Sequence, residues 1–155
     1  MSELTSRDND ARTAPAAVRR LDGLRTVQTS ERLAIAVGGA AGAYARIAVA
    51  EIVGPPGDGW PWATFCVNIV GALLLGYLIA RLLERLPPST YRRPFVATGF
   101  CGALTTFSTL QFELLSLIQA GRPALALAYG TVTVVCGFLA MFLAIALVRR
   151  VRVMR

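Results

Sequence analysis

Four long stretches of the chain are almost free of charged residues, and short polar segments separate them. They cover residues 33–53, 59–80, 94–121 and 123–148. About 20 apolar residues are enough for a helix to cross the hydrocarbon core of a bilayer, so each stretch is long enough to span it. The pattern predicts an all-α integral membrane protein with four transmembrane helices joined by short connections.

The two ends of the chain differ from the spans because they are rich in charge. Residues 1–30 mix acidic and basic side chains with few large apolar ones, which predicts a disordered N-terminal tail. Residues 33–148 form the four-span domain, and residues 149–155 form a basic C-terminal tail. Only 16% of all residues are charged, against about 25% in a typical soluble domain, so a water-soluble fold is excluded.

All sixteen basic residues are arginine, and nearly all of them lie on one side of the predicted spans. Six precede the first span, four lie between the second and third spans, and four follow the fourth span. The opposite side has a single one, Arg122. Because arginine-rich loops stay in the cytoplasm, both termini are expected on the cytoplasmic side of a bacterial inner membrane.

The inventory of reactive side chains argues against an enzyme. The chain has no histidine, so catalytic triads, a histidine base and histidine metal ligands are excluded. Its three cysteines lie in apolar segments without a CxxC spacing, which argues against disulfides and a zinc site. With no evident pair of nucleophile and base, an enzyme is the least expected class.

Polar residues inside the spans are the candidates for function. Asn68 lies in the middle of the second span, and Arg46 and Glu113 are the charges placed well inside spans. A buried amide in lipid either joins two helices or donates to an anion, and both alternatives stay open for Asn68. Arg46 lies near one end of the first span, where snorkelling to the interface would give it a structural role.

The third span contains a dense group of glycine and hydroxyl residues between Thr98 and Thr109. A single hydroxyl in a membrane helix can bond to a carbonyl of its own helix, so an unbroken helix is one interpretation. The density of the group around Gly99 and Gly102 also fits a third helix broken mid-membrane. At such a break, freed carbonyls can hold a cation and the start of the next half-helix favours an anion.

Four motifs follow one another along the spans. The first span contains GGAAGAYAR at residues 38–46, and the second contains TFCVNIVG at residues 64–71. The third contains TGFCGALTTFSTL at residues 98–110, and the fourth has Ala128, Tyr129 and Thr133. In order and spacing this set resembles the Fluc (CrcB) family of bacterial fluoride channels, over roughly residues 33–148.

The resemblance implies an antiparallel dimer with two pores that passively export cytoplasmic fluoride. It also implies a structural, non-transported sodium ion held by backbone carbonyls of Gly102 and Thr105 from both subunits. The implied fluoride pathway follows polar side chains and a phenylalanine ring edge, with Glu113 near one end: Asn68, Phe107, Ser108, Thr109, Tyr129, Thr133 and Glu113. The family often has a second phenylalanine where this chain has Leu110, so conduction is expected to rely more on Phe107, and Leu110→Phe is expected to be tolerated.

Two functions of other classes also fit a small four-span protein. A small multidrug-type exporter coupled to protons needs a membrane-embedded carboxylate, usually in the first span, where this chain has only Glu51 at the end. The other alternative is a membrane scaffold without transport activity.

The arginine distribution also bears on the partner. A chain that forms an antiparallel homodimer must insert in both orientations, which requires a weak charge bias. The strong bias of this chain instead favours a dimer with an oppositely oriented paralogue, and the homodimer is the alternative.

Overall fold

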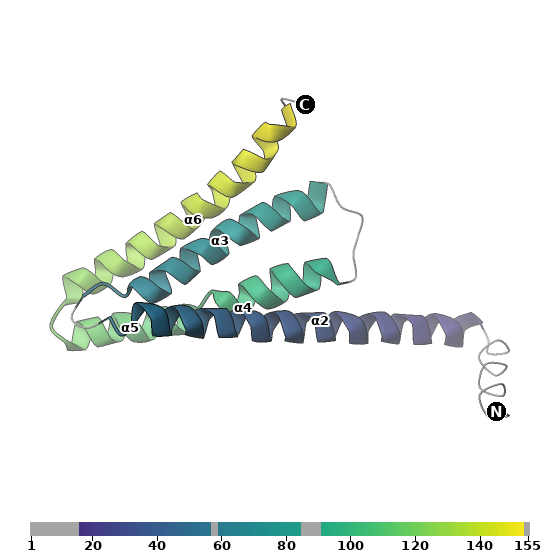
Figure 1. Cartoon of the computed structure of the whole chain (residues 1–155), viewed down its shortest axis with the longest axis horizontal. Helices are drawn as coiled ribbons and strands as arrows, with labels where there is room; N and C mark the ends of the chain where they lie inside the picture. The colour runs from purple at the N-terminus through teal and green to yellow at the C-terminus, as the bar shows by residue number, and fades with distance from the viewer. Residues whose placement is uncertain (1–15, 57–58, 85–90, 154–155) are drawn as a thin grey trace.

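The computed structural model describes residues 16–56, 59–84 and 91–153, and these residues form helices and no strand. In chain order the helical elements are α2 (Ala16–Val53), α3 (Trp62–Glu84), η1 (Pro94–Cys101), α4 (Gly102–Leu104), α5 (Phe107–Gln119) and α6 (Pro123–Val153) (Figure 1). The candidate membrane spans are Gln28–Val53, Trp62–Arg81, Pro94–Gln119 and Pro123–Arg150. The prediction of an all-α protein with four apolar spans is therefore confirmed.

The N-terminal boundary differs from the prediction. Helix α2 begins at Ala16, so residues 16–30 are helical rather than a disordered tail, while residues 1–15 lie outside the described part. The segment is rich in alanine, leucine and arginine, which favour helix, and it continues directly into the first span. Its charge pattern alone therefore did not indicate that it is helical.

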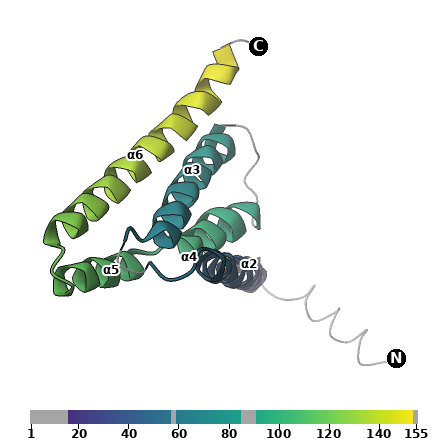
Figure 2. The ribbon, with the colours of Figure 1, turned by 60° about the vertical axis from the view of Figure 1, so that its left-hand side comes forward.

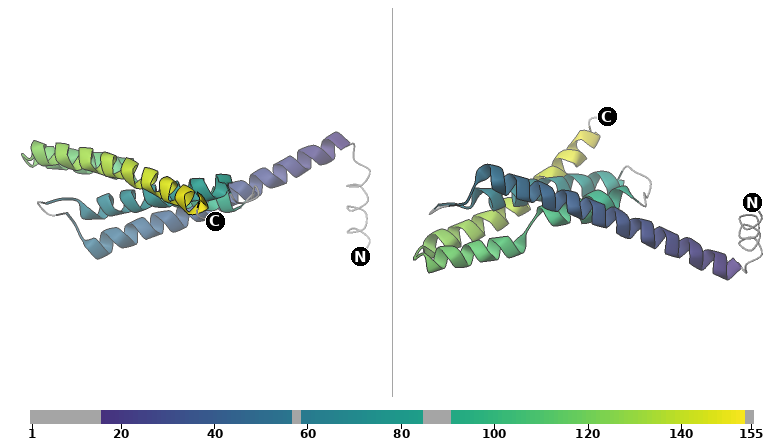
Figure 3. Two further views of the ribbon diagram at one scale, coloured as in Figure 1. Left: turned by 90° about the horizontal axis from the view of Figure 1, so that it is seen from above. Right: turned by 60° about the horizontal axis from the view of Figure 1, so that its bottom comes forward.

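The helices pack in two groups, and the third span takes part in both. Helix α2 lies along η1 and α4, while α3 lies along α6, and α5 packs against α6 (Figures 2 and 3). The contact between α2 and η1 is close enough that a Cβ at Gly38 or Gly42 would overlap the carbonyl oxygens of Phe95 and Phe100. Small residues at these positions let the two backbones approach, as is typical of membrane helices.

The third span is not one continuous α-helix. Its first part, η1, is a π-helix, and it continues into the single turn α4 that ends at Leu104. Thr105 (φ −75°, ψ 149°) and Thr106 (φ −144°, ψ 121°) are extended, and α5 begins at Phe107. The dense group of glycine and hydroxyl residues therefore coincides with an interruption of two residues between half-helices.

Large apolar side chains cover much of the outer surface. On α6, for example, Phe138, Phe142 and Leu143 are each more than 60% exposed in the single chain. A compact buried cluster lies between α5 and α6 and includes Leu110 and Tyr129. This distribution is expected of a protein whose exterior faces hydrocarbon or another subunit rather than water.

Candidate functional site

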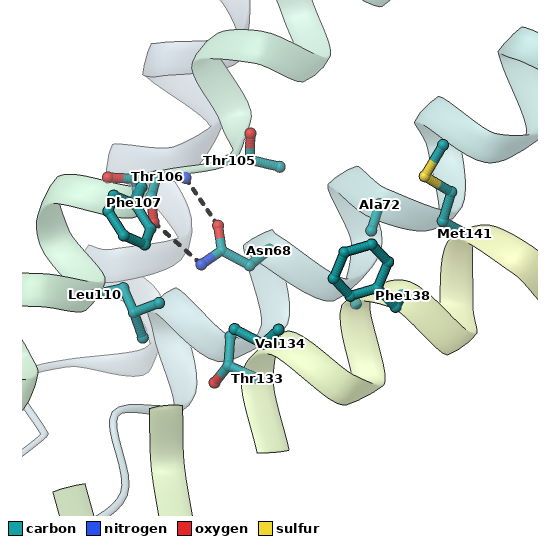
Figure 4. A pocket seen from close by; sticks show the side chains of 11 residues that line it. Asn68, Ala72, Thr105, Thr106, Phe107, Leu110, Thr133, Val134, Phe138 and Met141 are labelled. Carbon is teal, nitrogen blue, oxygen red and sulfur yellow. Dashed lines mark hydrogen bonds between the residues drawn. The ribbon is translucent and has the colours of Figure 1, made fainter. Parts of the chain in front are cut away.

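The interruption in the third span is held by one side chain of α3. The Asn68 amide nitrogen donates to the Thr106 carbonyl oxygen over 3.1 Å, and the Thr106 N–H donates to the Asn68 carbonyl oxygen over 2.8 Å (Figure 4). The amide thus satisfies both backbone groups of an extended residue, as a neighbouring strand would. It also keeps one N–H that Thr106 does not use, because an amide nitrogen carries two hydrogens.

The carbonyl groups of Gly102 and Thr105 are among those that lose their helical donors at this interruption. In a continuous helix the Gly102 carbonyl would accept from the Thr106 N–H, which instead donates to Asn68. The Thr105 carbonyl would accept from the Thr109 N–H, which instead donates to the Thr106 hydroxyl over 3.2 Å. Gly102 is exposed, with open space where its Cβ would be. These two carbonyls therefore fit the predicted cation site, since unwound backbone carbonyls are typical sodium ligands in membrane proteins.

Thr106 caps the second half-helix and gathers hydroxyl groups around the start of α5. Its hydroxyl donates to the Thr109 hydroxyl over 2.9 Å and lies 3.3 Å from the Ser108 hydroxyl. The first N–H groups of a helix carry a partial positive charge that favours anions. Ser108 and Thr109, both predicted pathway residues, thus lie at the positive end of a 13-residue helix.

Three predicted pathway residues line one groove. Asn68 from α3, Phe107 from α5 and Thr133 from α6 border an open groove of about 320 Å³ (Figure 4). The Phe107 side chain is 69% exposed, so its ring is available to an ion or to a second subunit. The Thr133 hydroxyl donates to the Tyr129 carbonyl of its own helix over 2.7 Å, so it must rotate before it can donate to an anion.

Leu110 occupies a different environment from the one expected at the second ring position. It also borders the groove, but its side chain is only 5% exposed and belongs to the cluster that contains Leu117 and Tyr129. A larger ring at this position must displace that cluster. The expectation that Leu110→Phe is tolerated is therefore not supported, because overpacking typically costs about 1–3 kcal/mol.

The Glu113 side chain, in the middle of α5, links this helix to α3 and α6. One carboxylate oxygen accepts from the Thr64 hydroxyl of α3 over 2.7 Å, and the other accepts from the Tyr129 hydroxyl of α6 over 2.6 Å. The Trp60 ring packs edge-on against Tyr129, with 5.2 Å between ring centroids. Tyr129 is fully buried, and its hydroxyl is already bonded to Glu113.

Arg46 has a more central position than sequence reasoning gave it. Its Nε donates to the Ala103 carbonyl over 3.2 Å, beside the interruption, rather than reaching for the interface. With Thr64, Thr106 and Thr109 it borders a small cavity of about 120 Å³. A guanidinium and three threonine side chains around one cavity can bind an anion. The sequence did contain a feature that could have indicated this role, because an arginine inside a membrane span is a functional candidate by default.

The predicted residues therefore form two groups that meet at Thr106. One group borders the groove and contains Asn68, Phe107 and Thr133. The other surrounds the small cavity and the Glu113 carboxylate, with Thr109 and Tyr129 among its members. Thr106 borders both the groove and the small cavity. Polar groups therefore continue from α6 past the interruption toward Glu113, in the middle of α5.

Comparison with known proteins decides the family. Residues 33–145 match the model of the family described as "CrcB-like protein, Camphor Resistance (CrcB)". The chain belongs to this family. Among family relatives, "Fluoride-specific ion channel FluC 1" of Mycobacterium bovis is 54% identical over 125 residues, which cover 81% of this chain and 95% of that protein.

More distant members carry similar names. A FluC 1 protein of Streptomyces coelicolor is 38% identical over 136 residues, which cover 88% of both chains. "Fluoride-specific ion channel FluC" of Chlorobium phaeobacteroides is 37% identical over 115 residues, covering 74% of this chain and 89% of that protein. The names describe ion channels rather than enzymes, which agrees with the absence of histidine from the sequence.

Proposed function

We propose that this protein is a fluoride-selective passive ion channel that exports cytoplasmic fluoride and so relieves its toxicity. The observation that carries the proposal is the pair of hydrogen bonds between Asn68 and Thr106. These bonds hold the third span interrupted, so helix termini and carbonyl groups lie within an apolar span. Irregular backbone is tolerated at membrane depth only where it is buried in protein or lines a polar space. The names of the family relatives supply the ion.

The pathway has the chemistry that a small, strongly hydrated anion requires. The unused N–H of Asn68 and the hydroxyls of Ser108 and Thr109 replace water donors, and the start of α5 adds a positive partial charge. The edge of the Phe107 ring is the positive part of its quadrupole and can face an anion. Arg46 attracts the anion to the small cavity, and Glu113, which accepts from the Thr64 and Tyr129 hydroxyls, lies near one end of the pathway.

Export needs no energy-coupling residue. Fluoride enters a cell as hydrogen fluoride and is trapped as the ion in the more alkaline cytoplasm. An interior-negative potential then drives the anion outward, with about 2.3 kcal/mol for each 100 mV. A proton-coupled exporter would need a membrane-embedded carboxylate that exchanges protons, whereas both oxygens of Glu113 accept hydrogen bonds and Glu51 is exposed at the end of α2.

The pore forms in an antiparallel dimer whose two subunits share a structural sodium ion. The groove beside Phe107 is open in the single chain, and Gly102 faces open space, so a second subunit can close both. Carbonyls of Gly102 and Thr105 from each subunit bind the sodium, which compensates for the helical donors that these carbonyls have lost. The ion is structural and is not transported.

The second subunit is an oppositely oriented paralogue. The protein lies in the bacterial inner membrane, and the one-sided distribution of arginine favours an orientation with both termini in the cytoplasm. A partner with the opposite bias supplies the antiparallel orientation, and a homodimer is the alternative. Labelling of a cysteine placed at the C-terminal end, in cells that express this chain alone, separates the two. Cytoplasmic labelling supports the paralogue, and equal labelling from both sides supports the homodimer.

Growth on fluoride tests the function in cells. A bacterial strain without its own fluoride channels should grow at higher fluoride concentration when it expresses this chain with its paralogue. Cells with Phe107→Ile should remain sensitive, whereas Phe112→Ile, which changes an exposed ring on the same helix, should protect like the wild type. Equal sensitivity of all three strains, with the protein present in the membrane, would contradict the proposal.

A further inference from the structure

A second groove, away from the proposed pathway, lies between α2 and η1. It has a volume of about 430 Å³. Its α2 wall consists of residues spaced i, i+3, i+4 and i+7, and Phe95 lies on the η1 wall. The α2 residues are Ser30, Leu33, Ala34 and Val37. Leu33 and Val37 are about 60% exposed in the single chain. The groove runs beside the point where Gly38 meets the Phe95 backbone, so its depth is fixed by a tight helix contact.

The polar end of this groove is basic. Arg92 lines it, Arg93 caps η1 one residue before the apolar part of the third span, and Arg32 precedes Leu33 on α2. Glu31 is the acidic residue next to this end on α2. The candidate third span begins at Pro94, so Arg92 and Arg93 lie at headgroup depth and the apolar walls lie at the depth of the acyl chains.

We propose that this groove binds one anionic phospholipid. The phosphate contacts Arg92, which lines the groove, and Arg93, the next residue along the chain, and one acyl chain follows Leu33, Val37 and Phe95. Basic pockets between membrane helices on the arginine-rich side are the sites where anionic headgroups bind. A zwitterionic lipid fits the apolar walls equally well, but it has no net negative charge to complement the arginines. The proposal is independent of fluoride conduction and requires only that the four spans lie in a bilayer.

Competition between two lipids tests this proposal. The purified full-length protein in mild detergent is mixed with equal amounts of phosphatidylglycerol and phosphatidylcholine that carry the same acyl chains, and bound lipid is counted by native mass spectrometry. The wild type should retain phosphatidylglycerol preferentially. Each arginine at a membrane surface contributes about fivefold in affinity for anionic lipid, so the double variant Arg92→Gln, Arg93→Gln should lose most of the preference.

Two further variants separate the groove from the general charge of the protein. Arg149→Gln with Arg150→Gln removes an equal number of exposed arginines at the end of α6 and should keep the preference. Val37→Trp fills the apolar part and should reduce retention of both lipids, while circular dichroism shows an unchanged helix content. None of these residues lines the proposed fluoride pathway, so a measurement of fluoride efflux reports separately on the channel.

Three results would overturn the proposal: no lipid preference in the wild type, a preference that survives loss of Arg92 and Arg93, or an equal loss in the α6 control. Soluble glycerol phosphate should not displace the lipid. If it displaced phosphatidylglycerol at similar concentration, the site would be an ordinary phosphate site and the acyl-chain groove would be refuted.

Discussion

Replacing Asn68 by leucine removes both hydrogen bonds that hold the extended Thr106, and it should reduce stability and fluoride flux together. The substitution leaves a backbone N–H and a carbonyl without their partner, and each unsatisfied buried group costs about 1–3 kcal/mol. Side-chain hydrogen bonds between membrane helices average about 0.6 kcal/mol, which sets the lower limit. For two groups the expected loss therefore lies between about 1 and about 6 kcal/mol, seen as a decrease in the Tm of the purified protein of about 2–4 °C for each kcal/mol lost.

Asn68→Asp separates the structural contribution of this side chain from its contact with the anion. Aspartate still accepts from the Thr106 N–H but its carboxylate cannot donate to the Thr106 carbonyl, and a charge at membrane depth costs about 2.5–3.5 kcal/mol, so its loss of stability should be comparable to that of leucine. Its negative charge at the groove should also lower fluoride flux by at least about tenfold, because like charges repel strongly where water is excluded. Cys66→Ala, at an exposed position of the same helix, is the control. Wild-type Tm and flux in Asn68→Leu would refute the reasoning.

Three other expectations follow from the same region. Phe107→Ile should severely reduce fluoride flux while Phe112→Ile does not, since both rings are exposed but only Phe107 borders the groove; equal flux in both would exclude the ring edge from the pathway. Leu110→Phe should lower stability by about 1–3 kcal/mol, measured by thermal unfolding, and an unchanged Tm would show that the α5–α6 cluster adapts. Removing sodium should abolish flux although labelled sodium does not cross, and conduction without sodium would contradict a site at Gly102 and Thr105.

The four spans could be predicted from the sequence because length and hydropathy alone determine whether a helix can cross a bilayer. The interruption in the third span was also indicated, since glycine and hydroxyl residues concentrate there. Which carbonyls lose their donors could not be read from composition. That outcome depends on a contact between Asn68 and Thr106, which lie 38 positions apart. The candidate carbonyls came from the family resemblance instead.

Three features show the limits of sequence patterns here. The polar segment before the first span suggested disorder, yet helix propensity and continuity with the span make residues 16–30 helical. Arg46 was interpreted as snorkelling, but it donates to the Ala103 carbonyl. The sequence did not indicate this contact, because the two positions are far apart in the chain. Leu110→Phe was expected to be tolerated, whereas the burial of Leu110 against Tyr129 follows from how α5 meets α6.

Fluoride efflux from proteoliposomes tests the central claim most directly. Vesicles loaded with potassium fluoride and containing sodium on both sides are prepared with this chain, alone and together with its oppositely biased paralogue. Valinomycin is added without any proton gradient, and external fluoride is followed with an electrode. The account predicts rapid fluoride efflux from the paired protein, abolished by Phe107→Ile, and no comparable efflux from vesicles loaded with chloride. Absence of fluoride efflux from both preparations, or efflux that requires a proton gradient, would contradict it.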